Sequence, residues 1–171
     1  MPYPKLNMLL DESTDFGDRK AVLNAQIDYV NISSVREAYE SFVNFTNENP
    51  EAAQTHIEID LIDSKKIASI PSDSTAFHPR KQFYNIAIIQ RWNTKHYDKI
   101  VYNWGKNVQS IFNKDGDKSL YVNFMDTTTE HVYKNEEILK NVWAKNYEKL
   151  KELKRKYDPN VLFRKGAVIF P

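Results

Sequence analysis

The chain has 171 residues, of which 41% are hydrophobic and 27% charged, a composition typical of a soluble globular domain. Its formal net charge of +1 argues against a nucleic-acid-binding protein, and no run of about 20 apolar residues predicts a membrane span. The sequence has no cysteine, which excludes disulfides, thiolate catalysis and cysteine-bound metals. Its first residues predict no signal peptide, so we expect a soluble protein whose compartment stays open.

Hydrophobic periodicity divides the chain into strands and helices. A helical stripe spaced by three and four residues predicts helices, and alternation of apolar and polar residues predicts strands. The predicted elements are an irregular lead-in over the first ~16 residues, a strand at 21–30, a helix capped by Ser33 or Ser34 and ending before Pro50, a strand at 55–62, a candidate partner strand at 66–70, a strand at 82–92, a helix at 96–112, a strand at 119–125, and a helix at about 136–156 that stops at Asp158-Pro159.

The order of these elements indicates the fold class. Strands that follow one another without crossover helices favour antiparallel pairing. We therefore predict an α+β fold, in which an antiparallel β-sheet carries helices on one face and leaves the other face open. We also expect that open face to expose an apolar and aromatic patch, through which the chain binds hydrophobic dye or self-associates.

The strand predicted at residues 119–125 offers the clearest candidate site. Alternation places Tyr121 and Asn123 on one face and their apolar neighbours on the other. A phenol and a carboxamide on the uncovered sheet face make a reasonable ligand-facing pair. An ordinary solvated strand face explains the same pattern, so both interpretations stay open.

Other chemical signals are weaker. His56, Glu58 and Asp60 share a strand face, but alternate residues rise about 7 Å per step, which is too far for one ion unless the strand bulges. We therefore predict no metal site. The basic run at 149–156 contains an interleaved glutamate and fits a solvated helix face.

Three elements in the last 50 residues occur in an order that resembles a known family. They read YVNFMD at 121–126, WAKNYEKL at 143–150 and KRKYDPNVLFR at 154–164. This set is similar to the C-terminal berberine-like segment of FAD-linked oxidases of the berberine bridge enzyme family, which have a vanillyl-alcohol oxidase-type fold. Weaker similarity continues upstream at residues 2–11 and in TAFHPR at 75–80.

The resemblance implies a function and a missing part. It predicts an FAD-dependent oxidoreductase that oxidises an alcohol, sugar or alkaloid-like substrate by hydride transfer to the flavin. In the family, the domain that holds most of the FAD lies N-terminal to this region, so we expect a chain that is inactive alone. We divide it into a partial substrate domain at 1–118 and a berberine-like C-terminal segment at 119–171, forming one compact unit.

The resemblance also implies roles for individual residues. Tyr121 would be the phenol that assists substrate deprotonation, and Asp73 falls where some members carry a substrate-facing acid. The remaining candidates are Asn123, Asn146 and Tyr147 for the cofactor, and Arg80, Gln90 and Trp92 for the substrate. For Tyr147, packing within the last helix is an equally good explanation.

Two positions depart from the family pattern. The order Pro-His-Arg stands here as His78-Pro79-Arg80, which moves the imidazole by one position. Lys149 stands where the family usually has arginine, which weakens any planar, bidentate contact there.

The sequence leaves three functional hypotheses open. The chain is part of a flavin oxidase, a non-catalytic binding or interaction module that retains the fold, or an unrelated α+β domain. Under the first, its partners are an FAD-binding domain or neighbouring chain and a small-molecule substrate, with no nucleic acid and no membrane. A neighbouring gene for a flavin-binding domain would favour the first hypothesis over the second.

Overall fold

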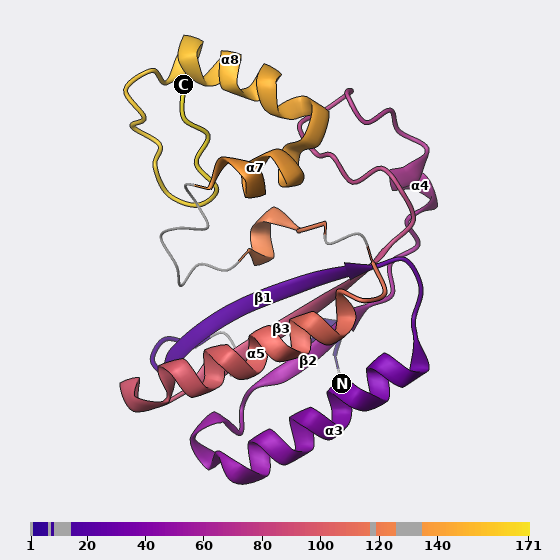
Figure 1. The fold of residues 1–171 in the computed structure, drawn as a ribbon, viewed down its shortest axis with the longest axis vertical. Coiled ribbons are helices and arrows are strands. Elements are labelled where there is room, and N and C mark those ends of the chain that lie inside the picture. Colours follow the sequence, from indigo (N-terminus) through magenta and orange to yellow (C-terminus); the bar gives the residue numbers. More distant parts are fainter. Residues whose placement is uncertain (1, 7, 9–14, 117–118, 126–134) are drawn as a thin grey trace.

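A computed structural model describes residues 2–6, 8, 15–116, 119–125 and 135–171. Its centre is an antiparallel sheet of three strands in the order β1-β3-β2 (Figure 1). The strands are β1 (Arg19–Ile27), β2 (His56–Asp60) and β3 (Tyr84–Trp92), and β3 pairs with both neighbours. The sheet does not close on itself, and the predicted α+β class is confirmed.

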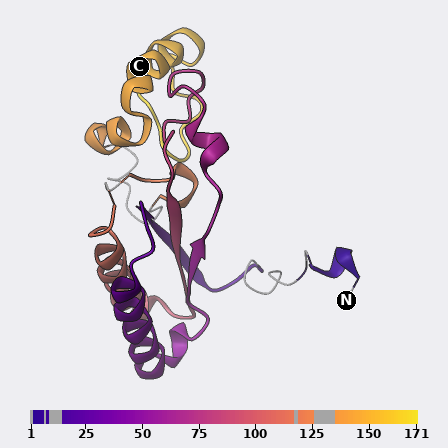
Figure 2. The same ribbon diagram turned by 90° about the vertical axis from the view of Figure 1, so that its right-hand side faces the viewer.

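Two helices cover one face of this sheet. Figure 2 shows α3 (Ile32–Glu48) and α5 (Asp98–Phe112) on the same side of the strands. Alternate strand residues such as Leu23 and Ile88 are fully buried against them, because one face of each strand is apolar. Trp104 of α5 stacks on Phe45 of α3 with ring centroids 4.4 Å apart, which joins the two helices above the sheet.

Helix α3 begins earlier than predicted. Its N-cap is Asn31, whose side-chain oxygen accepts a hydrogen bond from the backbone N–H of Ser33 at 3.0 Å. The prediction of a cap at Ser33 or Ser34 is therefore wrong. Asparagine ranks with serine as an N-cap, and Ser34 is buried inside the helix, where it cannot act as the flanking residue.

Three further predictions of local structure are wrong. The candidate strand at 66–70 is the short helix α4 (Lys65–Ala68), and the strand at 119–125 is instead a 3-10 turn, η3 (Val122–Phe124). The last helix is divided at Ala144, whose φ of +41° breaks the helical path. Its parts are α7 (Glu136–Trp143), η4 (Ala144–Asn146) and α8 (Tyr147–Tyr157). The described residues also form the short elements α1 (Tyr3–Leu6), η1 (Pro50–Ala52) and η2 (Lys95–Tyr97).

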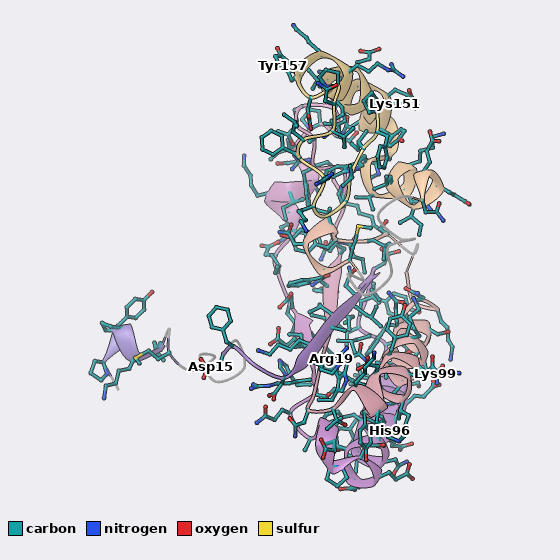
Figure 3. The ribbon with its side chains drawn as sticks, turned by 90° about the vertical axis from the view of Figure 1, so that its left-hand side faces the viewer. Asp15, Arg19, His96, Lys99, Lys151 and Tyr157 are labelled. Atoms are coloured by element: carbon teal, nitrogen blue, oxygen red, sulfur yellow. The ribbon has the colours of Figure 1, made fainter. Side chains whose placement is uncertain are left out.

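The C-terminal helices lie beyond one end of the sheet. In Figure 1, α7 and α8 lie past that end, separated from α3 and α5 along the long axis of the molecule. Figure 3 shows Tyr157 and Lys151 of α8 at this end, and Arg19 of β1 with Lys99 of α5 at the opposite one. No helix among the described residues is long and apolar enough to cross a membrane.

Candidate functional site

The sheet face that α3 and α5 leave uncovered carries two polar rows beside the apolar pair Val22 and Ile89. Its residues are those that alternate with the buried apolar ones in each strand. Gln26, Asn85 and Asp60 form a row across all three strands, because Asn85 is paired with both of the others. The next row contains Asn24 and Glu58, which flank Ala87. The prediction of an apolar, aromatic patch is therefore wrong for these rows of the face.

One side chain in the first row has no partner. Gln26 is fully buried, yet neither its Oε1 nor its Nε2 makes a hydrogen bond within the described part of the chain. A buried polar group without a partner costs about 1–3 kcal/mol. By contrast, Asn85 donates from Nδ2 to Asp60 Oδ2 at 3.0 Å, which fixes its carboxamide. The row thus combines an oriented amide with an unsatisfied one.

The η3 turn is attached to β1 through Asn24. Both polar atoms of the Asn24 carboxamide are satisfied when its oxygen accepts from the Tyr121 N–H at 3.0 Å and its nitrogen donates to the Phe124 carbonyl at 3.3 Å. Asn24 is buried by this contact and sits on the face opposite the helices. The residues around η3 therefore lie against the uncovered face of β1.

Tyr121 and Asn123 are brought together, although no strand carries them. Asn123 Nδ2 donates to Tyr121 Oη at 2.8 Å. The Tyr121 ring meets the Phe124 ring edge-on, with centroids 5.3 Å apart. The pair is held by a turn, in which the Phe124 N–H bonds the Tyr121 carbonyl at 2.9 Å, instead of by strand alternation.

Asn146 contacts the loop that carries Asp73. Its Nδ2 donates to the carbonyls of Ser72 at 2.7 Å, Thr75 at 3.1 Å and Ala76 at 3.3 Å. Asp73 and Asn146 both line a cavity of about 150 Å³ beside this contact. The predicted cofactor role of Asn146 stays a prediction, and the contact found is to this loop.

Tyr147 is packed inside the C-terminal helices. It is buried, and Lys140 lies over its ring at 5.7 Å. Burial raises the pKa of the Tyr147 hydroxyl, and the nearby Glu136 carboxylate adds to that effect. These contacts agree with the packing interpretation, and its cofactor role stays a prediction.

Arg80 is oriented by its own loop. Its Nη2 donates to Thr75 Oγ1 at 2.6 Å, and its guanidinium lies 5.1 Å from the Phe77 ring centroid. Arg80 Nε and His78 Nδ1 are buried and have no hydrogen-bond partner among the described residues.

Gln90 and Trp92 lie on the helix-covered side. Gln90 is fully buried and donates to the Val101 carbonyl of α5. Trp92 Nε1 donates to Asp98 Oδ1 at 2.8 Å. A hydrogen bond from Arg19 lowers the pKa of Asp98, with Trp92 contributing less. The structure does not bring these two residues to the uncovered face, and their substrate roles stay predictions.

The polar residues of the face were missed by sequence reasoning. Asn24 and Gln26 stand two apart in the apolar part of β1, residues 21–27, and Asn85 is the second residue of β3. That spacing is a usable signal, since carboxamides at alternate positions of a buried strand require partners. Among the described residues, no group of three histidine or acidic side chains is placed to hold a metal ion.

Comparison with known families addresses the C-terminal part. Residues 120–168 match the family described as berberine and berberine like. The chain carries a berberine-like segment. The predicted resemblance is confirmed, and the segment contains Tyr121, Asn123, Asn146 and Tyr147. No curated protein matches the chain.

Solved structures share the fold of nearly the whole chain. Chitooligosaccharide oxidase matches 90% of it with 20% identity and a TM-score of 0.65. Berberine bridge enzyme from Eschscholzia californica matches 97% with 19% identity and a TM-score of 0.66, and Physcomitrella patens BBE-like 1 matches 100% with 15% identity and a TM-score of 0.68. The chain covers 33%, 36% and 33% of those structures, respectively, so it spans about a third of their length. The berberine-like segment here thus accompanies part of a sheet that such oxidases share.

Proposed function

We propose that this chain forms the substrate-side part of an FAD-dependent oxidoreductase that oxidises an alcohol, sugar or alkaloid-like molecule. The observation that carries the proposal is the placement of the berberine-like segment. Its η3 turn is bound to Asn24, on the same polar sheet face as the buried, unpartnered Gln26. A face with unmet hydrogen-bonding groups beside a berberine-like segment supports a site completed by a polar ligand.

The residues of this face fit a flavin. A flavin ring presents carbonyl, N–H and aromatic N groups along its edges, and a carboxamide can both donate and accept. Asn123 is the carboxamide that would meet it, since its side chain is exposed, whereas Gln26 lies on the same face but is fully buried in the chain alone. When bound, FAD supplies the acceptor for the hydride that leaves the substrate C–H bond. We propose that most of the FAD is held by a domain or neighbouring chain outside this sequence.

The side chains of this chain then bind and deprotonate the substrate. Tyr121 Oη accepts a hydrogen bond from Asn123, which holds the phenol in one orientation. We assign it the removal of the hydroxyl or N–H proton of the substrate. Asp60 accepts a hydrogen bond from Asn85 Nδ2, which sets the orientation of this carboxamide in the face.

The loop at 71–80 supplies the second wall in this proposal. Arg80 is held by Thr75 and by the Phe77 ring, and Asp73 lies beside the cavity near Asn146. A guanidinium and a carboxylate on one loop can orient polar groups of a substrate. Whether the substrate bonds to the Arg80 guanidinium, to the Asp73 carboxylate or to both depends on its chemical class.

The test is reconstitution of the complete site. The purified chain is mixed with FAD and a flavin-binding domain encoded in the same genome. Flavin absorbance and peroxide are then followed with an alcohol, an oligosaccharide and a tertiary-amine alkaloid. We expect peroxide only when both polypeptides are present. Lys99→Ala, at the remote end of the sheet, serves as a control that should leave turnover unchanged (Figure 3).

Two outcomes separate the hypotheses. Binding of the second domain or of substrate without any peroxide would favour a non-catalytic module that retains the fold. Failure to bind either FAD or the second domain, with no peroxide from any substrate, would contradict the proposal.

A further inference from the structure

One carboxamide joins the berberine-like segment to the loop at residues 71–80, here named the substrate loop. Asn146 Nδ2 lies within hydrogen-bond distance of the Ser72, Thr75 and Ala76 carbonyls, at 2.7, 3.1 and 3.3 Å. The two N–H groups of Asn146 are thus shared among three acceptors. We infer that Asn146 is a positioning residue that latches the substrate loop onto the berberine-like segment.

The latch is the loop's hydrogen-bonded link to the rest of the described chain. Its other hydrogen bonds are internal: Ser74 Oγ donates to the Pro71 carbonyl at 2.6 Å, and Arg80 donates to Thr75 Oγ1. Hydrogen bonds that hold a loop to its neighbours contribute to the free energy at which that loop opens locally. Loss of the Asn146 donors should therefore release the loop while the sheet stays folded.

The break in the C-terminal helix places Asn146 at this point. Ala144 adopts a φ of +41°, which ends α7, and η4 turns the chain before α8 begins. Asn146 lies in η4 and is only 6% exposed. An unbroken helix over 136–156 would rotate this side chain by a regular 100° per residue and would not provide the turn. The positive φ of Ala144 and the buried position of Asn146 are therefore parts of the same local structure.

The latch has a consequence for the proposed reaction. Asp73 lies within the latched segment, and Arg80 lies at its end, bonded to Thr75. Their positions near a substrate therefore depend on Asn146, whose amide nitrogen is bonded to the loop carbonyls. This consequence rests on the proposed function, whereas the latch itself does not.

The first experiment uses the isosteric variant Asn146→Asp in the full chain. Aspartate keeps the size of the side chain but, when ionised, has no donor for the three carbonyls. Hydrogen exchange of the Ser74 N–H, which bonds the Pro71 carbonyl inside the loop at 3.2 Å, should at pH 8 become roughly tenfold faster than in the wild type, while exchange in β3 stays unchanged. The matched control is Asn141→Asp, an exposed position on α7, which should leave the loop unchanged.

A pH series distinguishes loss of the donor from loss of packing. Three carbonyl oxygens disfavour the ionised form of the new carboxyl, so its proton is retained at a higher pH than usual. Protonation restores one donor, and the loop of Asn146→Asp should regain protection at pH 5. The other titratable groups facing the site are Asp73 and Lys149, which line the same cavity, and His78 lies further along the loop. Wild-type protein measured at each pH accounts for their titration.

If Asn146→Asp does not fold, a second pair of variants tests the same inference. Asn146→Ser keeps one donor and Asn146→Ala keeps none, so the loop in the serine variant should exchange more slowly than in the alanine variant. Equal exchange in wild type and Asn146→Asp, an equal rise in loop and β3, or equal exchange in the serine and alanine variants would each overturn the latch.

The functional consequence is measured separately on the reconstituted enzyme. Asn146→Asp should raise KM by a larger factor than it lowers kcat, because the wall of the site loosens while Tyr121 is unchanged. A released loop with wild-type KM would overturn the link to substrate. A failure of reconstitution would count against the proposed function and not against the latch, since hydrogen exchange requires no flavin.

Discussion

Asn123 donates its carboxamide N–H to the hydroxyl of Tyr121 across 2.8 Å, within a single 3-10 turn. This bond fixes the direction in which the phenol oxygen presents its remaining lone pair. The same turn is bound through its backbone to Asn24 on the sheet. The phenol is therefore oriented by two carboxamides, one on its own turn and one on β1.

This relationship predicts the effect of Tyr121→Phe in the reconstituted enzyme. Removal of the hydroxyl should lower kcat by about 10²–10⁴-fold, the usual contribution of a general base, with flavin binding unchanged. Steady-state kinetics and flavin absorbance test this. The control is Tyr29→Phe, which removes a hydroxyl from an exposed tyrosine outside the proposed site. Wild-type kcat in Tyr121→Phe would remove Tyr121 from the mechanism.

Strand and helix positions were largely predictable from the sequence. The alternation at 55–62 and the apolar run at 82–92 correspond to β2 and β3, since burial of one or both faces leaves a clear pattern. The alternation at 119–125 was misleading. Five residues with period two also fit a turn, and here Phe124 N–H bonds the Tyr121 carbonyl instead of a neighbouring strand.

The composition of the site was less predictable. Gln90 and Gln26 are both glutamines in apolar strands, yet one faces α5 and the other faces away from the helices. When a strand is apolar on both sides, its sequence does not show whether the odd-numbered or the even-numbered residues face the helices. The register of strand pairing determines which set does. The sequence correctly placed Tyr121 and Asn123 near each other. Residues two apart in the chain lie close in a turn as well as in a strand.

The two buried glutamines provide a matched test of the uncovered face. Gln26→Leu removes a carboxamide with no partner among the described residues, so it should raise the free energy of unfolding by about 1–2 kcal/mol. Gln90→Leu removes the bond to the Val101 carbonyl and should lower it by about 1–3 kcal/mol. Urea unfolding of the isolated chain measures both changes.

The same substitution should have the opposite effect on ligand binding. If Gln26 meets the flavin or substrate, Gln26→Leu weakens flavin retention in the reconstituted enzyme while stabilising the chain. Gln90→Leu should not combine higher stability with weaker flavin retention. A Gln26→Leu protein that is both more stable and fully able to retain flavin would argue against a ligand at this row.

The helix break at Ala144 predicts a stabilising substitution. A non-glycine residue at this positive φ stores about 1–3 kcal/mol, and glycine adopts the conformation without that strain. The added freedom of glycine in the unfolded chain costs about 0.5–1 kcal/mol. Ala144→Gly should therefore raise Tm by roughly 2–4 °C in thermal unfolding. The control Ala53→Gly, at an ordinary φ of −62°, should lower Tm, and a fall in both variants would contradict strain at Ala144.

The C-terminal tail is fixed by Asp158, which makes stability depend on acid pH. Its carboxylate accepts hydrogen bonds from Lys154, from the Leu162 N–H at 2.7 Å and from the Phe163 N–H at 3.1 Å. The Lys154 bond is the main reason that the pKa of Asp158 lies below its ordinary 3.8, and the two backbone bonds add to it. Because the folded chain holds this proton less tightly than the unfolded chain, the contribution is fully present above about pH 4–5. It is lost as pH falls below 3.8 through the folded-state value.

Asp158→Asn should therefore lower Tm at pH 7 and flatten its fall in acid. The amide cannot pair with the Lys154 ammonium and has one oxygen instead of two for the backbone N–H groups, so the tail is held less firmly at neutral pH. The difference in Tm between wild type and variant, measured by calorimetry from pH 7 to pH 2.5, should shrink at the acid end of this range. Glu152→Gln, at an exposed acid on the same helix, should give a small difference that is nearly constant with pH. A constant difference for Asp158→Asn as well would mean that neutral packing, and not the charged carboxylate, holds the tail against α8.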